Sequence, residues 1–142
     1  MTDAFDSGRG TRIHPLHAIF LAGVIPLFLG ALLSDWAYSS TYQVQWINFA
    51  SLLIAGVLLF AGAALIWSVI DAFRADRRGA PGWLLVTLVA ATFVLGFVNA
   101  LVHARDAWAS MPMGLILSVI VLALAIASVW VGFSPRRLGD AR

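Results

Sequence analysis

The chain has 142 residues, of which 61% are hydrophobic, 11% are charged and none is cysteine. A soluble domain is usually about 45–50% apolar and about 25% charged, so this composition excludes a soluble enzyme, a disulfide-bonded scaffold and a disordered tail. The formal net charge is only +2, and the arginines lie outside the apolar stretches rather than along one face, which excludes a nucleic-acid-binding protein.

The nine arginines and seven aspartates that carry the charge leave four long uncharged stretches. These stretches are residues 13–34, 36–70, 79–104 and 107–135. A hydrocarbon core about 30 Å thick takes roughly 20 helical residues to cross, so each stretch is long enough for one membrane span. We therefore expect an all-α, polytopic integral membrane protein whose spans form a four-transmembrane-helix bundle.

The expected helices begin and end at prolines, glycines and charged residues. They cover residues 15–35, 46–70, 83–104 and 111–133. Pro15 suits a first helical turn, and the polar stretch after Asp35 is expected to end the first helix. A charged turn with glycine and proline separates the second and third helices, and the connection after Arg105 is short enough to make the last two an antiparallel hairpin. The transmembrane domain is thus expected over residues 14–133.

The arginines are distributed unevenly between the two sides of the membrane. Eight lie on one side, in the two tails and in the connection between the second and third helices: Arg9, Arg12, Arg74, Arg77, Arg78, Arg136, Arg137 and Arg142. The other side holds only Arg105. Because arginine-rich flanks stay on the cytoplasmic side, both termini are predicted to be cytoplasmic, as tails over residues 1–13 and 134–142.

Small residues recur at helical spacing within the predicted spans. The rows are Gly23, Gly30 and Ser34 in the first helix, Ser51 and Ala55 in the second, and Gly114, Ser118, Ser128 and Gly132 in the fourth. Such rows let helix backbones approach closely in lipid, where packing rather than water exclusion drives association. They are typical of packing seams within a bundle or within a homo-oligomer.

Ionisable and amide side chains within or beside the spans need partners, because they are costly in lipid. Asp35 ends the first predicted helix, while Asn99, His103 and Asp106 are four and three residues apart and so share one face of the third. With Arg105 they are expected to form a polar patch on the outer side. One interpretation is a structural hydrogen-bond network in which Arg105 neutralises a carboxylate. The other is a proton-handling, metal-binding or ligand-binding site that opens outward.

His14 and His17 form a second candidate cluster at the start of the first helix. Eighteen residues, or about 27 Å of helix, separate His17 from Asp35, so this cluster and His103 are expected at opposite membrane faces. No single metal ion can then bind all three histidines. A bis-histidine haem within one protomer is disfavoured as well, because its ligands must lie at the same depth, whereas a haem shared across a dimer axis or held by a methionine stays open.

Several short motifs follow one another along the chain. They are His14-Pro15-Leu16-His17, Pro26, Gly30-Ala31-Leu32-Leu33 with Asp35, His103-Ala104-Arg105-Asp106, and Pro112-x-Gly114-x-x-Leu117-Ser118. In these motifs the chain resembles the bacterial family of predicted membrane proteins called domain of unknown function 2231. The resemblance implies a four-helix integral membrane domain without an established activity, and it singles out His14, His17, Asp35 and His103.

The sequence favours a non-enzymatic accessory or scaffold protein of the bacterial inner (cytoplasmic) membrane, which packs in the lipid bilayer as a homo-oligomer or with other membrane subunits. One alternative is a redox or metal-handling protein that binds haem, a quinone or a metal ion through His and Asp. A second alternative is a small proton-coupled transporter, for which four spans suffice only in an oligomer. The sequence lacks the motifs of nucleotide-binding proteins, zinc peptidases and serine hydrolases.

Overall fold

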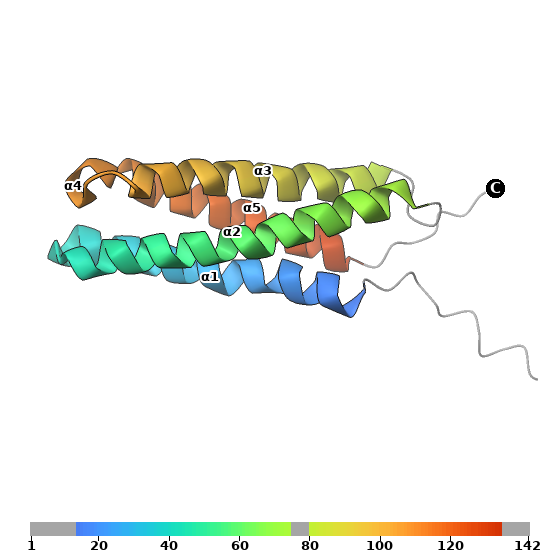
Figure 1. Cartoon of the computed structure of the whole chain (residues 1–142), viewed down its shortest axis with the longest axis horizontal. Coiled ribbons are helices and arrows are strands. Elements are labelled where there is room, and N and C mark those ends of the chain that lie inside the picture. The colour runs from blue at the N-terminus through green and yellow to red at the C-terminus, as the bar shows by residue number, and fades with distance from the viewer. Residues whose placement is uncertain (1–13, 75–79, 135–142) are drawn as a thin grey trace, which may run out of the picture.

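A computed structural model of the chain describes residues 14–74 and 80–134, and every regular element within them is helical. Four long helices and one short helix follow one another along the chain (Figure 1). The elements are α1 (Pro15–Thr41), α2 (Val44–Phe73), α3 (Ala80–His103), α4 (Ala107–Ser110) and α5 (Met113–Phe133).

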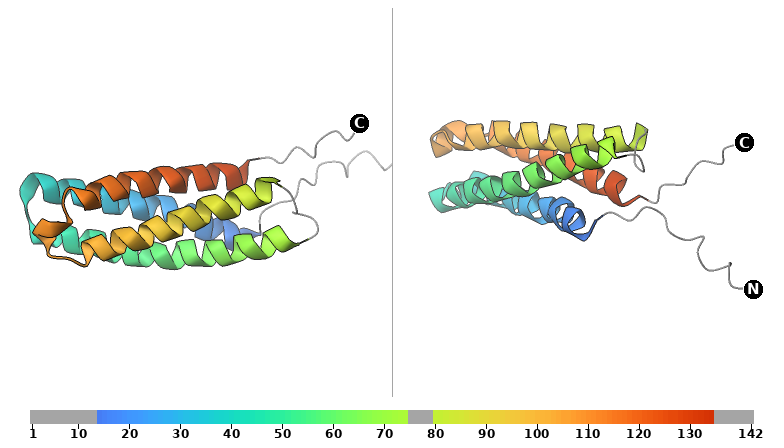
Figure 2. Two further views of the ribbon diagram at one scale, coloured as in Figure 1. Left: turned by 90° about the horizontal axis from the view of Figure 1, so that it is seen from above. Right: turned by 45° about the vertical axis from the view of Figure 1, so that its right-hand side comes forward.

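The long helices alternate in direction and form a four-cornered bundle. α1 packs against α2 and α5, and α3 packs against the same two helices, so that α1 and α3 stand at opposite corners (Figure 2). The α1–α2 connection and α4 lie at one end of the bundle, here called the α4 end. The start of α1 and the last turn of α5 lie at the opposite end, here called the terminal end.

Each long helix can cross a membrane. Within the described residues, four helical segments are long and apolar enough for a span: Pro15–Thr41, Val44–Phe73, Gly82–His103 and Met113–Phe133. Large apolar side chains such as Leu59 and Ile66 face outward, as expected where the surrounding solvent is lipid. The predictions of an all-α chain and of four such helices are confirmed.

The first helix continues six residues beyond Asp35, where we expected it to stop. The polar residues after Trp36 are helical, and their hydroxyl groups find acceptors on the same helix: Ser40 Oγ donates to Trp36 O at 2.9 Å, and Thr41 Oγ1 donates to Ala37 O at 2.7 Å. α1 ends at Thr41, and the next residue, Tyr42, has a left-handed backbone with φ 56°. Asp35 therefore lies inside the helix and not at its end.

The other helices also differ from their expected bounds by a few residues. α2 runs over Val44–Phe73 instead of 46–70, so Asp71 lies within it. α3 ends at His103, and Asp106 instead caps the start of the short helix α4, where its backbone carbonyl accepts bonds from the amides of Ala109 and Ser110. The expectation that Asp106 shares a face of the third helix with His103 is therefore wrong, because the helix stops before it.

The middle of the bundle is apolar and tightly packed. Its central cluster comes from α1, α2 and α5 and consists of Val24, Phe28, Val57, Ala61, Val121 and Ala125. Several of the small residues face neighbouring helices of the same chain: a Cβ atom on Gly23 would lie 2.7 Å from the Phe60 ring, and one on Gly30 would lie 3.0 Å from Leu53. These glycines therefore act as packing seams within one bundle.

Gly96 offers a direct test of this packing. A Cβ atom there would lie 3.0 Å from the ring of Phe28, whereas one on Gly56 would meet nothing within 4 Å. We expect Gly96→Leu to lower the stability by about 1–3 kcal/mol through overpacking, while Gly56→Leu leaves it unchanged or raises it. Thermal unfolding in detergent, followed by circular dichroism, measures both. Equal losses in the two variants would contradict this packing.

Candidate functional site

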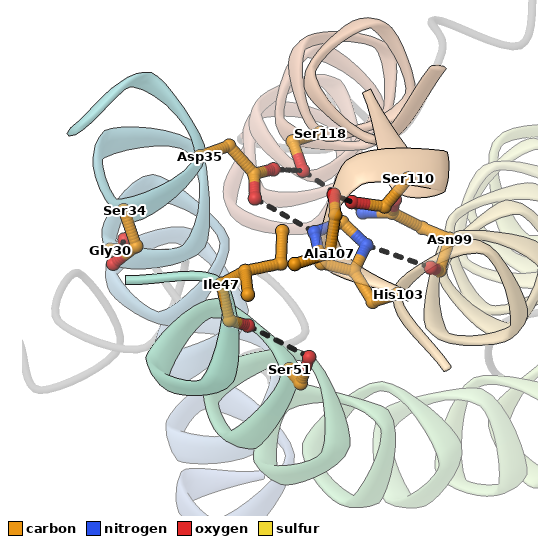
Figure 3. A network of polar contacts seen from close by, with 10 residues as sticks. All are labelled: Gly30, Ser34, Asp35, Ile47, Ser51, Asn99, His103, Ala107, Ser110 and Ser118. Atoms are coloured by element: carbon orange, nitrogen blue, oxygen red, sulfur yellow. Dashed lines mark hydrogen bonds and ion pairs between the residues drawn. The ribbon is translucent and has the colours of Figure 1, made fainter. Parts of the chain in front are cut away.

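Four polar side chains from three helices meet near the α4 end of the bundle. Asp35 comes from α1, Asn99 and His103 from α3, and Ser118 from α5, and they turn toward one another between the helices (Figure 3). Asp35, Asn99 and Ser118 are 0% exposed, and His103 is 5% exposed. The structure therefore brings together three of the residues that the sequence singled out, and it adds Ser118.

The backbone places these groups at matching depth. Asn99 and His103 are four residues apart on α3, so one lies a single turn from the other on the same face. Gly114 lies one turn before Ser118 on α5, and a Cβ atom on Gly114 would lie 2.9 Å from Cε1 of His103. The absence of a side chain at Gly114 thus makes room for the imidazole ring between α3 and α5.

Hydrogen bonds join the four residues into a closed ring, here called the Asp35–His103 ring. His103 Nε2 is 2.7 Å from Asp35 Oδ1, and Ser118 Oγ donates to Asp35 Oδ2 at 2.6 Å. Asn99 Nδ2 donates to Ser118 Oγ at 3.0 Å, and His103 Nδ1 lies 2.9 Å from the backbone carbonyl oxygen of Asn99. Among the described residues, Asn99 Oδ1 is the one acceptor in this ring without a donor.

The chemistry of the partners determines the direction of each bond. A backbone carbonyl can only accept, so His103 Nδ1 carries a hydrogen and donates it to Asn99 O. Ser118 accepts from the Asn99 amide and gives its own hydrogen to Asp35 Oδ2. The remaining contact, between His103 Nε2 and Asp35 Oδ1, must then contain one shared proton, because two bare acceptors would repel at 2.7 Å.

This shared proton leaves the pair without net charge. Whether the proton resides on the imidazole or on the carboxyl group, the His103 and Asp35 charges sum to zero. Such a pair is far less costly in a membrane interior than an isolated carboxylate, whose removal from water without a partner costs many kcal/mol. The ring can therefore hold a proton inside the bundle, and it ties α1, α3 and α5 to one another.

Two predicted members of the patch lie elsewhere. Arg105 and Asp106 are exposed in the connection between α3 and α4. The partners of the Asp35 carboxylate in the described residues are His103 and Ser118, so Arg105 is not the residue that neutralises Asp35. The turn after His103 directs Arg105 outward instead. Ser118 was missed as a site residue, although its four-residue spacing from Gly114 marked that face of α5 as a close contact.

A second buried pair lies toward the terminal end, between α1 and α2. His17 is 0% exposed, and its Nδ1 lies 3.5 Å from Oδ2 of Asp71. Its Nε2 is 3.1 Å from Ser68 Oγ, which gives its own hydrogen to the carbonyl of Ala64, so the His17 Nε2–H is the donor. Neither Ser68 nor Asp71 was predicted as a site residue. The second helix was expected to end at residue 70, so Asp71 was expected to lie just beyond it.

His14 does not join His17 in this pair. It is exposed, and its Nδ1 accepts a hydrogen bond from the backbone amide of Leu16, which caps the start of α1. Both imidazole rings lie against the ring of Trp67, with centroid distances of 4.8 Å for His14 and 6.2 Å for His17. In residues 14–74 and 80–134, no three His or Asp side chains are grouped closely enough to hold one metal ion.

The fold and these buried pairs define a four-helix membrane protein with ionisable groups inside its spans. Over residues 13–134, the chain matches the family described as predicted membrane protein (DUF2231). It therefore belongs to that family, as its motifs suggested. No curated protein and no solved structure matches the chain.

Substitutions at Asp35 test the ring energetically. In Asp35→Asn, the amide can accept from Ser118 and donate to a neutral His103, so the ring stays closed and the loss of stability is at most about 1.5 kcal/mol. Asp35→Ala opens the ring and is expected to cost about 3–5 kcal/mol, as breaking a buried pair does. Denaturant unfolding in detergent distinguishes the two. Asp106→Asn and Asp106→Ala, at an exposed residue, serve as matched controls and are expected to be neutral.

The direction of the His103 bonds can be observed by nitrogen-15 NMR of labelled protein in micelles. We expect a hydrogen on His103 Nδ1 in the wild-type protein and in Asp35→Asn, because the Asn99 carbonyl requires a donor in both. In Asp35→Asn the Nε2 atom should be an unprotonated acceptor, because the amide introduced at residue 35 donates to it. A His103 ring protonated on Nε2 alone would show that the ring is arranged differently.

Proposed function

We propose that this protein is a non-enzymatic accessory or scaffold protein of the bacterial inner membrane. The observation that carries the proposal is that the side chains of Asp35, His103 and Ser118 form hydrogen bonds with members of the ring. These bonds join different helices, and the side chains of Asp35, His103 and Ser118 are fully or almost fully buried. An arrangement of this kind supports a rigid bundle better than a site that receives a substrate.

The second buried pair supports the same role. His17 and Asp71 link α1 to α2 toward the terminal end, whereas the Asp35–His103 ring links α1 to α3 and α5 toward the α4 end. α1 is thus held at both ends by polar contacts, which are directional and so specify how the helices are rotated against one another. A bundle specified in this way can present a constant outer surface to membrane partners.

That outer surface consists of large apolar side chains, which suits a second copy of the chain or other membrane subunits. Leu59 on α2 and Trp130 on α5 are each 76% exposed. The uneven arginine distribution supports an orientation with residues 1–13 and 134–142 in the cytoplasm. In this orientation the Asp35–His103 ring lies toward the outer side of the inner membrane.

A proton-coupled carrier is the second candidate, and the shared proton between His103 and Asp35 is the observation that favours it. A carrier must take up and release that proton, and histidine is the side chain that does so most readily near neutral pH. Four helices would then act as part of an oligomer. A redox or metal-handling role would instead require a haem, a quinone or a metal ion on the His and Asp side chains.

Three kinds of measurement on purified protein separate these functions. An accessory protein is expected to be isolated in mild detergent with a stoichiometric partner or as an oligomer, and Asp35→Ala should weaken that assembly while Asp106→Ala does not. Proton uptake by vesicles that contain the wild-type protein alone, lost in the stably folded Asp35→Asn variant, would instead establish the carrier. A visible spectrum and metal analysis test the redox role, which a colourless, metal-free preparation would contradict.

The orientation is tested by reporter fusions in the bacterial membrane. A reporter fused after Arg142 is expected to be active only in its cytoplasmic form, because eight of the nine arginines lie on the side of the two termini. A reporter inserted after Ala107 is expected to be active only in its periplasmic form. The reverse pattern in both fusions would show that the outer and inner sides are exchanged.

A further inference from the structure

A pocket lies at the α4 end of the bundle, where the end of α1 meets α4 and the connection from α4 to α5 (Figure 1). Its volume is about 370 Å³, which is within the usual range for small-molecule sites. The pocket is separate from the Asp35–His103 ring, because no member of the ring lines it. The residues that line the pocket are Tyr38, Tyr42, Trp108, Ala109, Met111 and Pro112.

Tyr38 distinguishes this pocket from an ordinary aromatic surface. Exposed aromatic residues such as Tyr42 and Trp108, which are 70% and 81% exposed, are common at the boundary between hydrocarbon and headgroups, where their polar atoms meet water. Tyr38 is only 5% exposed, and its hydroxyl group has no hydrogen-bond partner among the residues that the structure describes. A buried tyrosine hydroxyl usually has such a partner, so this one is available to a ligand in the pocket.

The aromatic rings of the pocket form a corner and not a pair of parallel plates. The ring centroids of Tyr38 and Tyr42 are 6.2 Å apart, and the angle between the ring planes is 69°. A flat aromatic ligand stacks best between parallel rings, whereas a rounded group fits a corner between steeply angled ones. Trp108 adds a third ring to the same pocket. Several aromatic rings around one pocket are the arrangement that binds quaternary ammonium groups, because the faces of the rings carry partial negative charge.

The charges around the pocket also favour a cation. α1 has 27 residues and no basic residue in its last turn, so no basic side chain of that turn offsets the partial negative charge at the carboxyl end of the helix. Tyr38 lies in this turn, and Tyr42 directly follows it. Among the described residues, no charged side chain lines the pocket. The exposed Arg105 and Asp106, in the connection before α4, carry opposite charges.

A quaternary ammonium group suits this lining better than a primary ammonium does. A primary ammonium has three N–H donors, and the side chains of the lining offer it only the phenol oxygens of Tyr38 and Tyr42. A trimethylammonium group has no N–H, so it loses no hydrogen bond when aromatic rings and the flexible Met111 side chain surround it. The Tyr38 hydroxyl then remains available for an oxygen atom beside the cation.

We propose that this pocket binds a compound that carries a trimethylammonium group and a nearby oxygen atom, as choline does. The rings of Tyr38, Tyr42 and Trp108 contact the cation, and the Tyr38 hydroxyl bonds to the oxygen atom. A free small molecule and the headgroup of a phosphatidylcholine lipid both present this group at the membrane boundary. The site lies apart from the Asp35–His103 ring and does not depend on the accessory role proposed above.

The test compares two ligands by isothermal titration calorimetry of the purified full chain in a maltoside detergent. The uncharged analogue dimethylbutanol has the shape of choline, with a carbon atom in place of the charged nitrogen. We expect choline to bind at least tenfold more tightly than this alcohol, because the ring faces attract the positive charge. Equal affinities, or no binding of choline at millimolar concentration, would overturn the proposal.

Substitutions of the tryptophans test the aromatic wall. Trp108→Leu is expected to weaken choline binding at least fivefold. Trp36→Leu is the matched control and should leave binding unchanged, because Trp36 is also exposed, at 64%, but does not line the pocket. Both residues are exposed, so both variants should fold, which circular dichroism checks. Equal effects of the two substitutions would show that the cation does not bind at this pocket.

Tyr38→Phe tests the hydroxyl group separately, since it keeps the ring. It should weaken the binding of choline but not of tetramethylammonium, which has no oxygen atom for the hydroxyl to contact. Equal losses of affinity for the two ligands would overturn the assigned role of Tyr38.

Glycerophosphocholine, the soluble headgroup of phosphatidylcholine, distinguishes the two sources of the ligand. Tighter binding of this compound than of choline would assign a lipid headgroup, and weaker binding would assign a free small molecule. Either result supports the pocket as a trimethylammonium site.

Discussion

The contact between Asp35 and His103 is the constraint on which the bundle depends. A carboxylate in the hydrocarbon region is tolerated only with a partner that neutralises it. Here the partner comes from a helix at the opposite corner of the bundle, and the two atoms are 2.7 Å apart. The pair therefore requires α1 and α3 to face each other at one depth, and the surrounding packing has to allow it.

Packing allows that contact through small residues placed at specific depths. Gly114 on α5 makes room for the imidazole of His103 between α3 and α5. Gly96 on α3 makes room for the Phe28 ring in the apolar middle of the bundle. Ser118 then supplies a hydroxyl to the second oxygen of Asp35. In lipid the hydrophobic effect does not press helices together, so close packing and directed hydrogen bonds supply the association energy. The same physics explains the pair between His17 and Asp71, where α1 meets α2.

Part of the site could be predicted because polar residues in an apolar stretch stand out individually. Asp35, Asn99 and His103 were identified in this way, and the structure brings all three together. Asp106 was grouped with them because its spacing from His103 predicted a shared helix face, and Arg105 was expected to join the same patch. However, α3 ends at His103 and the chain turns outward. Ser118 was recognised only as a small residue, since a serine in a membrane helix serves equally as a packing residue and as a hydrogen-bond donor.

The sequence alone determined that this chain is a membrane protein with four helical spans. Hydropathy and helix length are local properties of the chain, and they can be compared directly with the thickness of the bilayer. The sequence also determined that the buried ionisable groups need partners. Only the tertiary structure decided which partners they have. Asp35 and His103 are 68 residues apart, and their contact depends on the order in which the helices pack and on how each is rotated about its axis. The packing order and the rotation of the helices depend on how side chains of different helices fit together. The residue pattern within a single helix does not determine that fit.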